Sequence, residues 1–102
     1  MKRKLKHDMQ AAITARIFEL KEKPFPELKA LPSLSDVPCQ SEGINFTVTT
    51  WTKLETTGKL QVGVYAYYVG KFNIGTSFND GFFINSEGSI EEMPVEIQLK
   101  RI

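Results

Sequence analysis

The stretch INFTVTTWTKLETTGKLQVGVYAYY, residues 44–68, decides the fold of this chain. It contains two runs rich in β-branched and aromatic residues, 44–52 and 60–68, a composition typical of β-strands. The segment between the runs includes Thr56-Thr57-Gly58, a loop sequence that ends in glycine. The stretch therefore predicts an antiparallel hairpin whose residues alternate between the two faces of a sheet.

The length of the loop decides which residues of the two strands face each other. If Thr56-Thr57-Gly58 is a three-residue loop with Gly58 left-handed, Glu55 pairs with Lys59. A two-residue turn would shift the register by one and set the apolar face of one strand against the polar face of the other. We therefore predict the three-residue loop, which aligns the apolar residues in the pairs Phe46–Tyr68, Val48–Ala66 and Leu54–Leu60.

The same register predicts an aromatic surface on the opposite face of the hairpin. Trp51 lies opposite Gly63, so its ring can extend across a residue that has no side chain. A surface that combines aromatic rings with hydroxyl groups suits a small ligand, a peptide or a second subunit. The candidate binding residues on this face are Trp51, Tyr65, Tyr67 and Thr49.

The sequence leaves a second interpretation of this surface open. A large exposed apolar patch is unusual on a monomer, so other parts of the chain can be expected to cover it. Phe72, Phe78 or the segment before the hairpin could provide that cover. The sequence does not decide between the two interpretations, because residues 70–81 can be read as strand or as loop.

The N-terminal segment 1–23 has the pattern of an amphipathic helix. We expect the helix to run from about Lys4 to about Glu22, because Pro24 pushes the residue before it out of the helical conformation. Residues 24–43 are then expected to form a proline-rich connector to the sheet. The apolar residues of the helix recur at steps of three and four: Leu5, Met9, Ala12, Ile13, Ile17 and Leu20.

Two helix residues do not fit this pattern. Arg16 falls inside the apolar stripe, where its planar guanidinium could contact an anionic ligand. The favoured interpretation is that its stem packs while the guanidinium reaches water. Phe18 falls on the polar face and could mark a partner surface. Packing of the connector against Phe18 is the expected explanation.

The remainder of the sheet is predicted from shorter patterns. Residues 72–74 are expected to be extended, and Asn79-Asp80-Gly81 is a turn signal. A second hairpin is expected across Ser86-Glu87-Gly88, followed by a last strand near 95–99. One helix on four or five antiparallel strands predicts a two-layer α+β fold. The single domain spans 1–102, with the sheet in 44–102.

Composition limits the class of protein. A chain of 102 residues with a net charge of +1 fits one globular domain and lacks the strong basic charge of a nucleic-acid-binding domain. A single cysteine, Cys39, excludes an internal disulfide and suits a reducing compartment. No signal peptide and no apolar run of about 18 residues is present. We expect a cytoplasmic protein that contacts neither nucleic acid nor membrane.

The sequence predicts no catalytic residue, no metal ligand and no cofactor. Cys39 and the lone histidine, His7, lie far apart and lack activating neighbours. The remaining route to an enzyme is a glutamate that shares a helix–sheet cavity with Tyr65 or Tyr67. Solvated charge at a sheet edge is the favoured interpretation of the three glutamates near the last hairpin, Glu87, Glu91 and Glu92.

The order of one helix, a linker and glycine-ended hairpins at 56–58 and 86–88 resembles cystatin-like α+β proteins. Among these, the chain is similar to small orphan proteins carried on bacterial integron gene cassettes. The resemblance implies the fold. It implies no functional residue, because Gln61-Val62-Gly63, a partial echo of the inhibitory loop of cystatins, falls inside a predicted strand.

These patterns favour a small, non-catalytic binding or interaction module that uses its aromatic sheet face. The expected partner is a second copy of the chain, another protein or a small molecule. The alternative is a small enzyme or ligand-binding protein with a Glu/Tyr pair in a cavity between helix and sheet.

Overall fold

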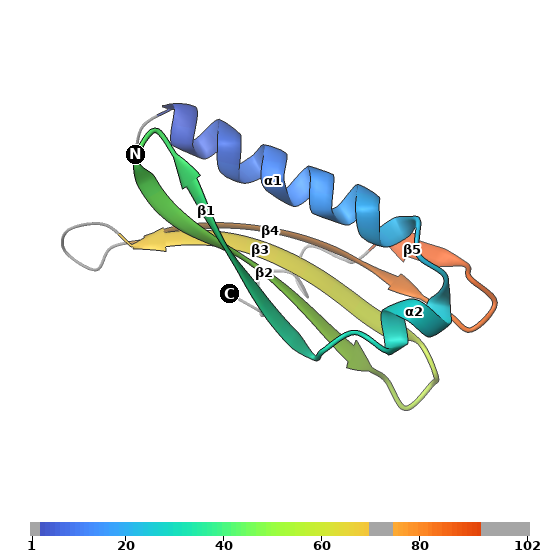
Figure 1. Ribbon diagram of the computed structural model, residues 1–102. Helices are drawn as coiled ribbons and strands as arrows, with labels where there is room; N and C mark the ends of the chain where they lie inside the picture. Colours follow the sequence, from blue (N-terminus) through green and yellow to red (C-terminus); the bar gives the residue numbers. More distant parts are fainter. Residues whose placement is uncertain (1–2, 70–74, 93–102) are drawn as a thin grey trace.

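The computed structural model describes residues 3–69 and 75–92 and has one long helix on an antiparallel sheet (Figure 1). Each strand pairs with its neighbour in the chain, so the strand order is β1-β2-β3-β4-β5. The described elements are α1 (Arg3–Lys21), α2 (Phe25–Lys29), β1 (Leu34–Ser41), β2 (Ile44–Leu54), β3 (Leu60–Val69), β4 (Gly75–Ile84) and β5 (Ile90–Glu92). The predicted α+β fold with four or five antiparallel strands is confirmed.

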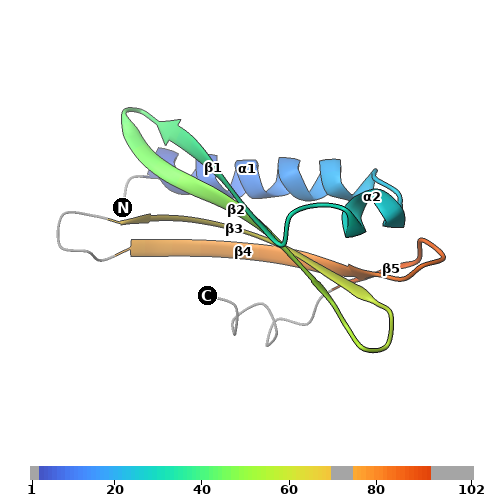
Figure 2. The same ribbon diagram turned by 60° about the horizontal axis from the view of Figure 1, so that its bottom comes forward.

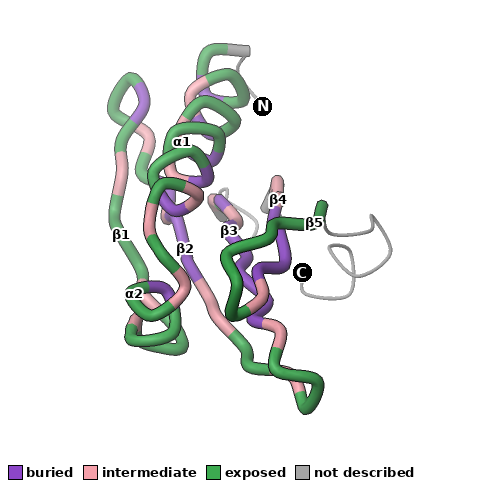
Figure 3. The backbone as a smooth tube through the Cα atoms, turned by 90° about the vertical axis from the view of Figure 1, so that its right-hand side faces the viewer, coloured by how far each residue is buried: buried purple, intermediate pink, exposed green. Residues whose placement is uncertain are grey.

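α1 lies along one face of the sheet, and the views in Figures 1 and 2 place no described helix on the other face. The buried positions of α1 face the strands, as the burial colours in Figure 3 show. The predicted stripe is confirmed, since Leu5, Met9 and Leu20 are at most 1% exposed. The sheet contributes Phe46, Val48, Val62, Val64, Ala66, Phe82 and Ile84 to the same core.

The β2–β3 hairpin has the predicted register. Leu54 pairs with Leu60 and Trp51 with Gly63. The N–H of Glu55 donates to the carbonyl of Lys59 over 2.8 Å, and Gly58 has a φ of 93°. A left-handed residue at this position favours glycine, so the three-residue loop follows directly from the sequence.

The β4–β5 hairpin repeats this loop. The N–H of Asn85 donates to the carbonyl of Ser89 over 3.1 Å, and Gly88 has a φ of 87°. The Asn85 side-chain oxygen also accepts the N–H groups of Glu87 and Ser89, each over 3.0 Å. The predicted turn at Ser86-Glu87-Gly88 is therefore confirmed.

Residues 24–43 do not form the connector that the sequence predicted. They contain α2 and the strand β1, which pairs with β2 through a two-residue turn at Glu42-Gly43. Leu28 of α2 is fully buried in the core, with Phe25 and Leu31 packed beside it. β1 contains Pro38, and a proline within a segment usually argues against a strand.

Pro38 is compatible with a strand because β1 lies at the edge of the sheet. The N–H of Thr52 donates to the carbonyl of Ser33 over 3.1 Å, so Ser33 faces β2 with its backbone groups. Backbone groups alternate in direction along an antiparallel strand. Pro38, five positions from Ser33, therefore turns its nitrogen to the free edge, where no hydrogen bond is lost.

The predicted turn at Asn79-Asp80-Gly81 is wrong. These residues lie within β4 and pair with Tyr65, Val64 and Gly63 of β3. Long-range pairing along the whole of β3 outweighs the local turn preference of this tripeptide. The predictions for residues 70–74 and for a last strand near 95–99 lie outside the described residues.

Candidate functional site

The candidate site is the aromatic face, defined as Trp51, Tyr65, Tyr67 and Thr49 on the side of the sheet away from α1. Thr49 pairs with Tyr65, and Trp51 pairs with Gly63, as the hairpin register requires. The rings of Tyr65 and Tyr67 are 5.8 Å apart between centroids and tilted by 34°. The structure thus brings the four candidate residues onto one face of two central strands.

Trp51 lies across Gly63. A Cβ atom built at Gly63 would be 2.1 Å from Cε2 of the indole, far inside van der Waals contact. The indole therefore occupies the space that any other residue at 63 would need. The predicted contact between a large ring and a residue without a side chain is present, and it leaves Trp51 half-buried.

Thr49 has a structural role on this face. Its side chain is fully buried, and its hydroxyl donates to a carboxylate oxygen of Asp36 over 2.6 Å. This bond joins β2 to β1, so Thr49 supports the aromatic face from below and does not present its hydroxyl to a ligand.

β1 adds a residue to the face that the sequence did not suggest. Leu34 pairs with Trp51 and is 58% exposed. Beside it, a hollow of about 340 Å³ is lined by Ser33, Leu34, Trp51, Thr52, Lys53 and Tyr65. Apolar and polar residues do not alternate in Leu34-Ser35-Asp36-Val37, so the sequence offers no signal that places Leu34 on this face.

The aromatic face is covered only in part. Phe78 packs against the core on the α1 side, so it does not provide the cover that the sequence allowed for. Phe72 lies outside the described residues. On the same face, Gln61 and Phe83 are buried, whereas Tyr67 is 36% exposed. The exposed large hydrophobic residues that the structure describes on this face are therefore Tyr67 at the end of β3 and Leu34 on β1.

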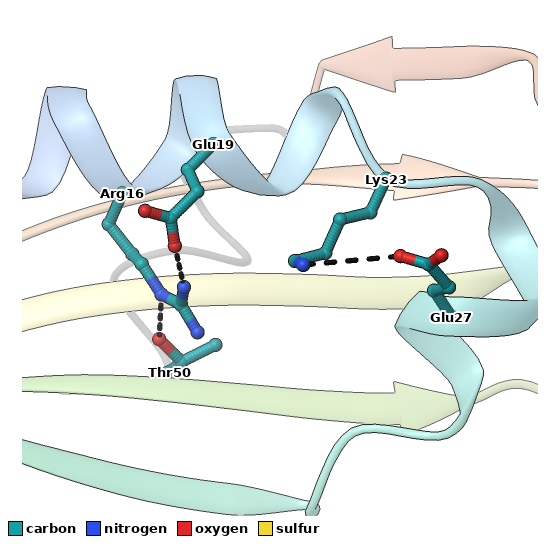
Figure 4. A network of polar contacts seen from close by, with 5 residues as sticks. All are labelled: Arg16, Glu19, Lys23, Glu27 and Thr50. Atoms are coloured by element: carbon teal, nitrogen blue, oxygen red, sulfur yellow. Dashed lines mark hydrogen bonds and ion pairs between the residues drawn. The ribbon is translucent and has the colours of Figure 1, made fainter.

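Arg16 does not belong to this face, because it lies between α1 and the sheet. Its Nε donates to the Thr50 hydroxyl over 3.1 Å, and its Nη1 forms an ion pair with Glu19 (Figure 4). The side chain is 26% exposed. Its planar fork already has a carboxylate partner within α1, so an anion would have to compete with Glu19.

The expectation that the connector covers Phe18 is wrong. Phe18 is 67% exposed on the outer face of α1. The apolar residues of the segment after α1 pack on the core instead, with Leu28 fully buried. Burial against the core removes more apolar surface from water than a contact on the outside of α1 would, so the segment folds inward.

The glutamates of the last hairpin lie at the surface. Glu91 pairs with Lys59 over 2.9 Å, and Glu92 pairs with Lys21 over 3.2 Å. Both carboxylates are well exposed, and Glu87 is exposed as well. Within residues 3–69 and 75–92, no group of three His, Cys, Asp or Glu side chains is arranged to hold a metal ion.

Asp8 ties α1 to the end of β1. The Ser41 hydroxyl donates to its carboxylate over 2.6 Å, and Lys4 lies 3.2 Å away. The hydrogen bond from Ser41, with a smaller contribution from Lys4, lowers the pKa of Asp8 below its ordinary value against a desolvation that raises it. This contact cannot be predicted from the sequence, because it requires Ser41 to lie at the end of a strand beside α1.

None of the described helices is long and apolar enough to cross a membrane. Comparisons with protein-family models, curated proteins and solved structures find no match for this chain.

Proposed function

We propose that the protein is a non-catalytic binding module whose aromatic face docks a protein partner. One observation carries the proposal: exposed Leu34 and Tyr67 flank the half-buried rings of Trp51 and Tyr65 on a face that α1 leaves open. Aromatic side chains supply large contact area at low conformational cost and are enriched at protein interfaces.

The hollow beside Trp51 suggests how a partner would bind. Leu34 and Tyr65 form apolar walls, and an apolar side chain of the partner fits between them. Lys53, which is exposed at the same hollow, would attract an acidic group at the rim of the interface. The expected partner surface is therefore apolar at its centre with an acidic residue nearby.

A protein partner suits this hollow better than a small molecule does. Small-molecule sites bury most of the ligand surface. Here Leu34, Lys53 and Ser33 are all exposed, so a small ligand would keep much of its surface in water. A protein would cover the hollow and Tyr67 together.

Other expectations from the sequence stay predictions. These are the cytoplasmic location, the homodimer and the resemblance to cystatin-like proteins of integron cassettes. The alternative of a small enzyme requires a glutamate and Tyr65 or Tyr67 in one helix–sheet cavity. A hollow of about 350 Å³ between α1 and the sheet is lined by Glu19 and Arg16. Tyr65 and Tyr67 lie on the opposite face of the sheet, so the described residues do not form that pair.

The test compares two substitutions on one strand. Leu34 and Val37 lie on opposite faces of β1 and are exposed to similar extents, 58% and 51%. Proteins captured from an extract of the source cells by the wild type are compared with those captured by Leu34→Ser, Tyr67→Ser and the matched control Val37→Ser. The proposal requires a partner that the first two variants lose and the control retains.

The captured protein is then purified and titrated against the wild type while Trp51 fluorescence is followed. A blue shift at saturation is expected, because docking removes water from the indole. A partner that binds Tyr67→Ser and Leu34→Ser as tightly as the wild type would refute the proposal.

A further inference from the structure

The outer face of α1, on the side away from the sheet, carries a second open hollow. It has a volume of about 610 Å³ and is lined by His7, Gln10, Ala11, Thr14, Ala15 and Phe18. All six residues are exposed, and Phe18 is 67% exposed. An amphipathic helix that packs only on its sheet needs no aromatic residue here.

The lining follows a pattern that accepts a side chain from another helix. His7, Gln10, Ala11 and Thr14 are spaced i, i+3, i+4, i+7, which is the arrangement of a hole in knobs-into-holes packing. Ala11 has a short side chain, so it leaves room in the middle of the hole. Phe18 lies one turn beyond the hole, at the C-terminal end of the same hollow.

We propose that a second copy of this chain docks here, with the two α1 helices antiparallel and Phe18 of each copy in the hole of the other. A two-fold axis near Thr14, midway between Phe18 and the hole, fills both holes at once. Thr14 and Ala15 then lie at the closest approach, where small side chains let the helices come together. The two contacts are equivalent, because Phe18 of each copy enters the hole on the other copy.

The charges on α1 favour the antiparallel arrangement. Its first turn has no acidic residue, and Lys4 and His7 lie on the outer face near this end, where Lys4 also pairs with Asp8 of its own helix over 3.2 Å. Glu22 is exposed just beyond the other end. Lys21 is turned toward the sheet, where it contacts Glu92 and the ring of Phe82. Antiparallel helices place Glu22 of each copy beside the basic end of its partner.

The size of the contact predicts a weak dimer. One phenyl ring and a few small side chains per copy cover less than the roughly 800 Å² per partner of a standard interface. We expect a dissociation constant in the range of roughly 10⁻⁵ to 10⁻³ M. The proposal is independent of the proposed function, because α1 and the aromatic face lie on opposite sides of the sheet.

Sedimentation of the full chain, from low micromolar to about 1 mM, tests the proposal. Phe18→Ser removes the inserted ring, and Ala11→Leu fills the hole. Each is expected to raise the dissociation constant at least tenfold. Leu54→Ser, which alters a residue 49% exposed at the end of β2, is the matched control and should leave dimerisation unchanged. Far-UV circular dichroism checks that every variant folds.

A charge reversal tests the direction of the helices. Glu22→Lys is expected to weaken the dimer, and adding Lys4→Glu is expected to restore part of the loss. A chain that remains monomeric at 1 mM, or a dimer that Phe18→Ser leaves intact, would overturn the proposal. A dimer broken by Tyr67→Ser alone would place the second copy on the aromatic face, which overturns this inference and upholds the proposed function.

Discussion

The two faces of the sheet are built differently. The face toward α1 is closed by aliphatic and phenyl side chains, and Val62, Val64 and Phe82 are fully buried there. The opposite face mixes half-exposed rings with polar contacts such as the bond from Thr49 to Asp36. One face therefore provides most of the stability, and the other can change its contacts at small cost. The predictions below test this division.

The largest effect is expected in the core. Phe82→Ala should lower the free energy of unfolding by about 3–5 kcal/mol, because it removes a fully buried ring and leaves a cavity. Tyr67→Ala, an exposed residue of the aromatic face, should cost less than about 1 kcal/mol. Urea unfolding followed by circular dichroism measures both. Similar losses in the free energy of unfolding for the two variants would show that both faces of the sheet contribute equally to stability.

Gly63→Ala should have the next largest effect. The added methyl group collides with the indole of Trp51, and relief of the clash should cost about 1–3 kcal/mol. Trp51 fluorescence should shift to the red as the ring is displaced. In the Trp51→Leu background the same substitution should cost much less, since the ring is gone. Equal costs in the two backgrounds would mean that the ring does not lie across Gly63.

Thr49→Val tests the polar support of the aromatic face. It removes the hydrogen bond to Asp36 but keeps the shape of the side chain, so a loss of about 0.5–1.5 kcal/mol is expected. Asp36→Asn, which keeps an acceptor for the hydroxyl, should cost less. Thermal unfolding of the two variants and the wild type measures these losses of stability. A greater loss for Asp36→Asn would assign the stabilisation to the charge of Asp36.

The smallest effect concerns pH. Because the pKa of Asp8 is lower in the folded chain than its ordinary value of 3.8, its charged form adds stability above that value. This contribution is lost as the pH falls through the lowered pKa. Asp8→Asn should therefore flatten the stability curve on the acid side and leave the slope near neutral pH unchanged. The unfolding midpoints of the wild type and of Asp8→Asn are measured from pH 2 to 7. The same dependence on pH in both proteins below pH 4 would show that Ser41 does not stabilise the charged carboxylate.

The central hairpin could be predicted from the sequence because the loop residues and the alternation of the two strands indicate the same pairing. Glycine at 58 and the alternation on both sides of the loop give the same register. β1 was missed because Pro38 is acceptable only at an edge, and edge position is not visible in a single sequence. Leu34 and Asp36 were lost from the candidate site for the same reason. The exposure of Phe18 depended on where α2 packs, which is a tertiary question.

Pro38 also has a consequence for how this chain behaves when crowded. An open sheet has two ends at which further strands could add without limit, the first step toward fibres. At one end, Pro38 removes a donor from the exposed row of β1. At the other end of the described sheet, β5 covers only three residues and carries Glu91 and Glu92. The edge of β1 is therefore blunted against the addition of a further strand, while the aromatic face beside it can still offer an apolar surface to a partner.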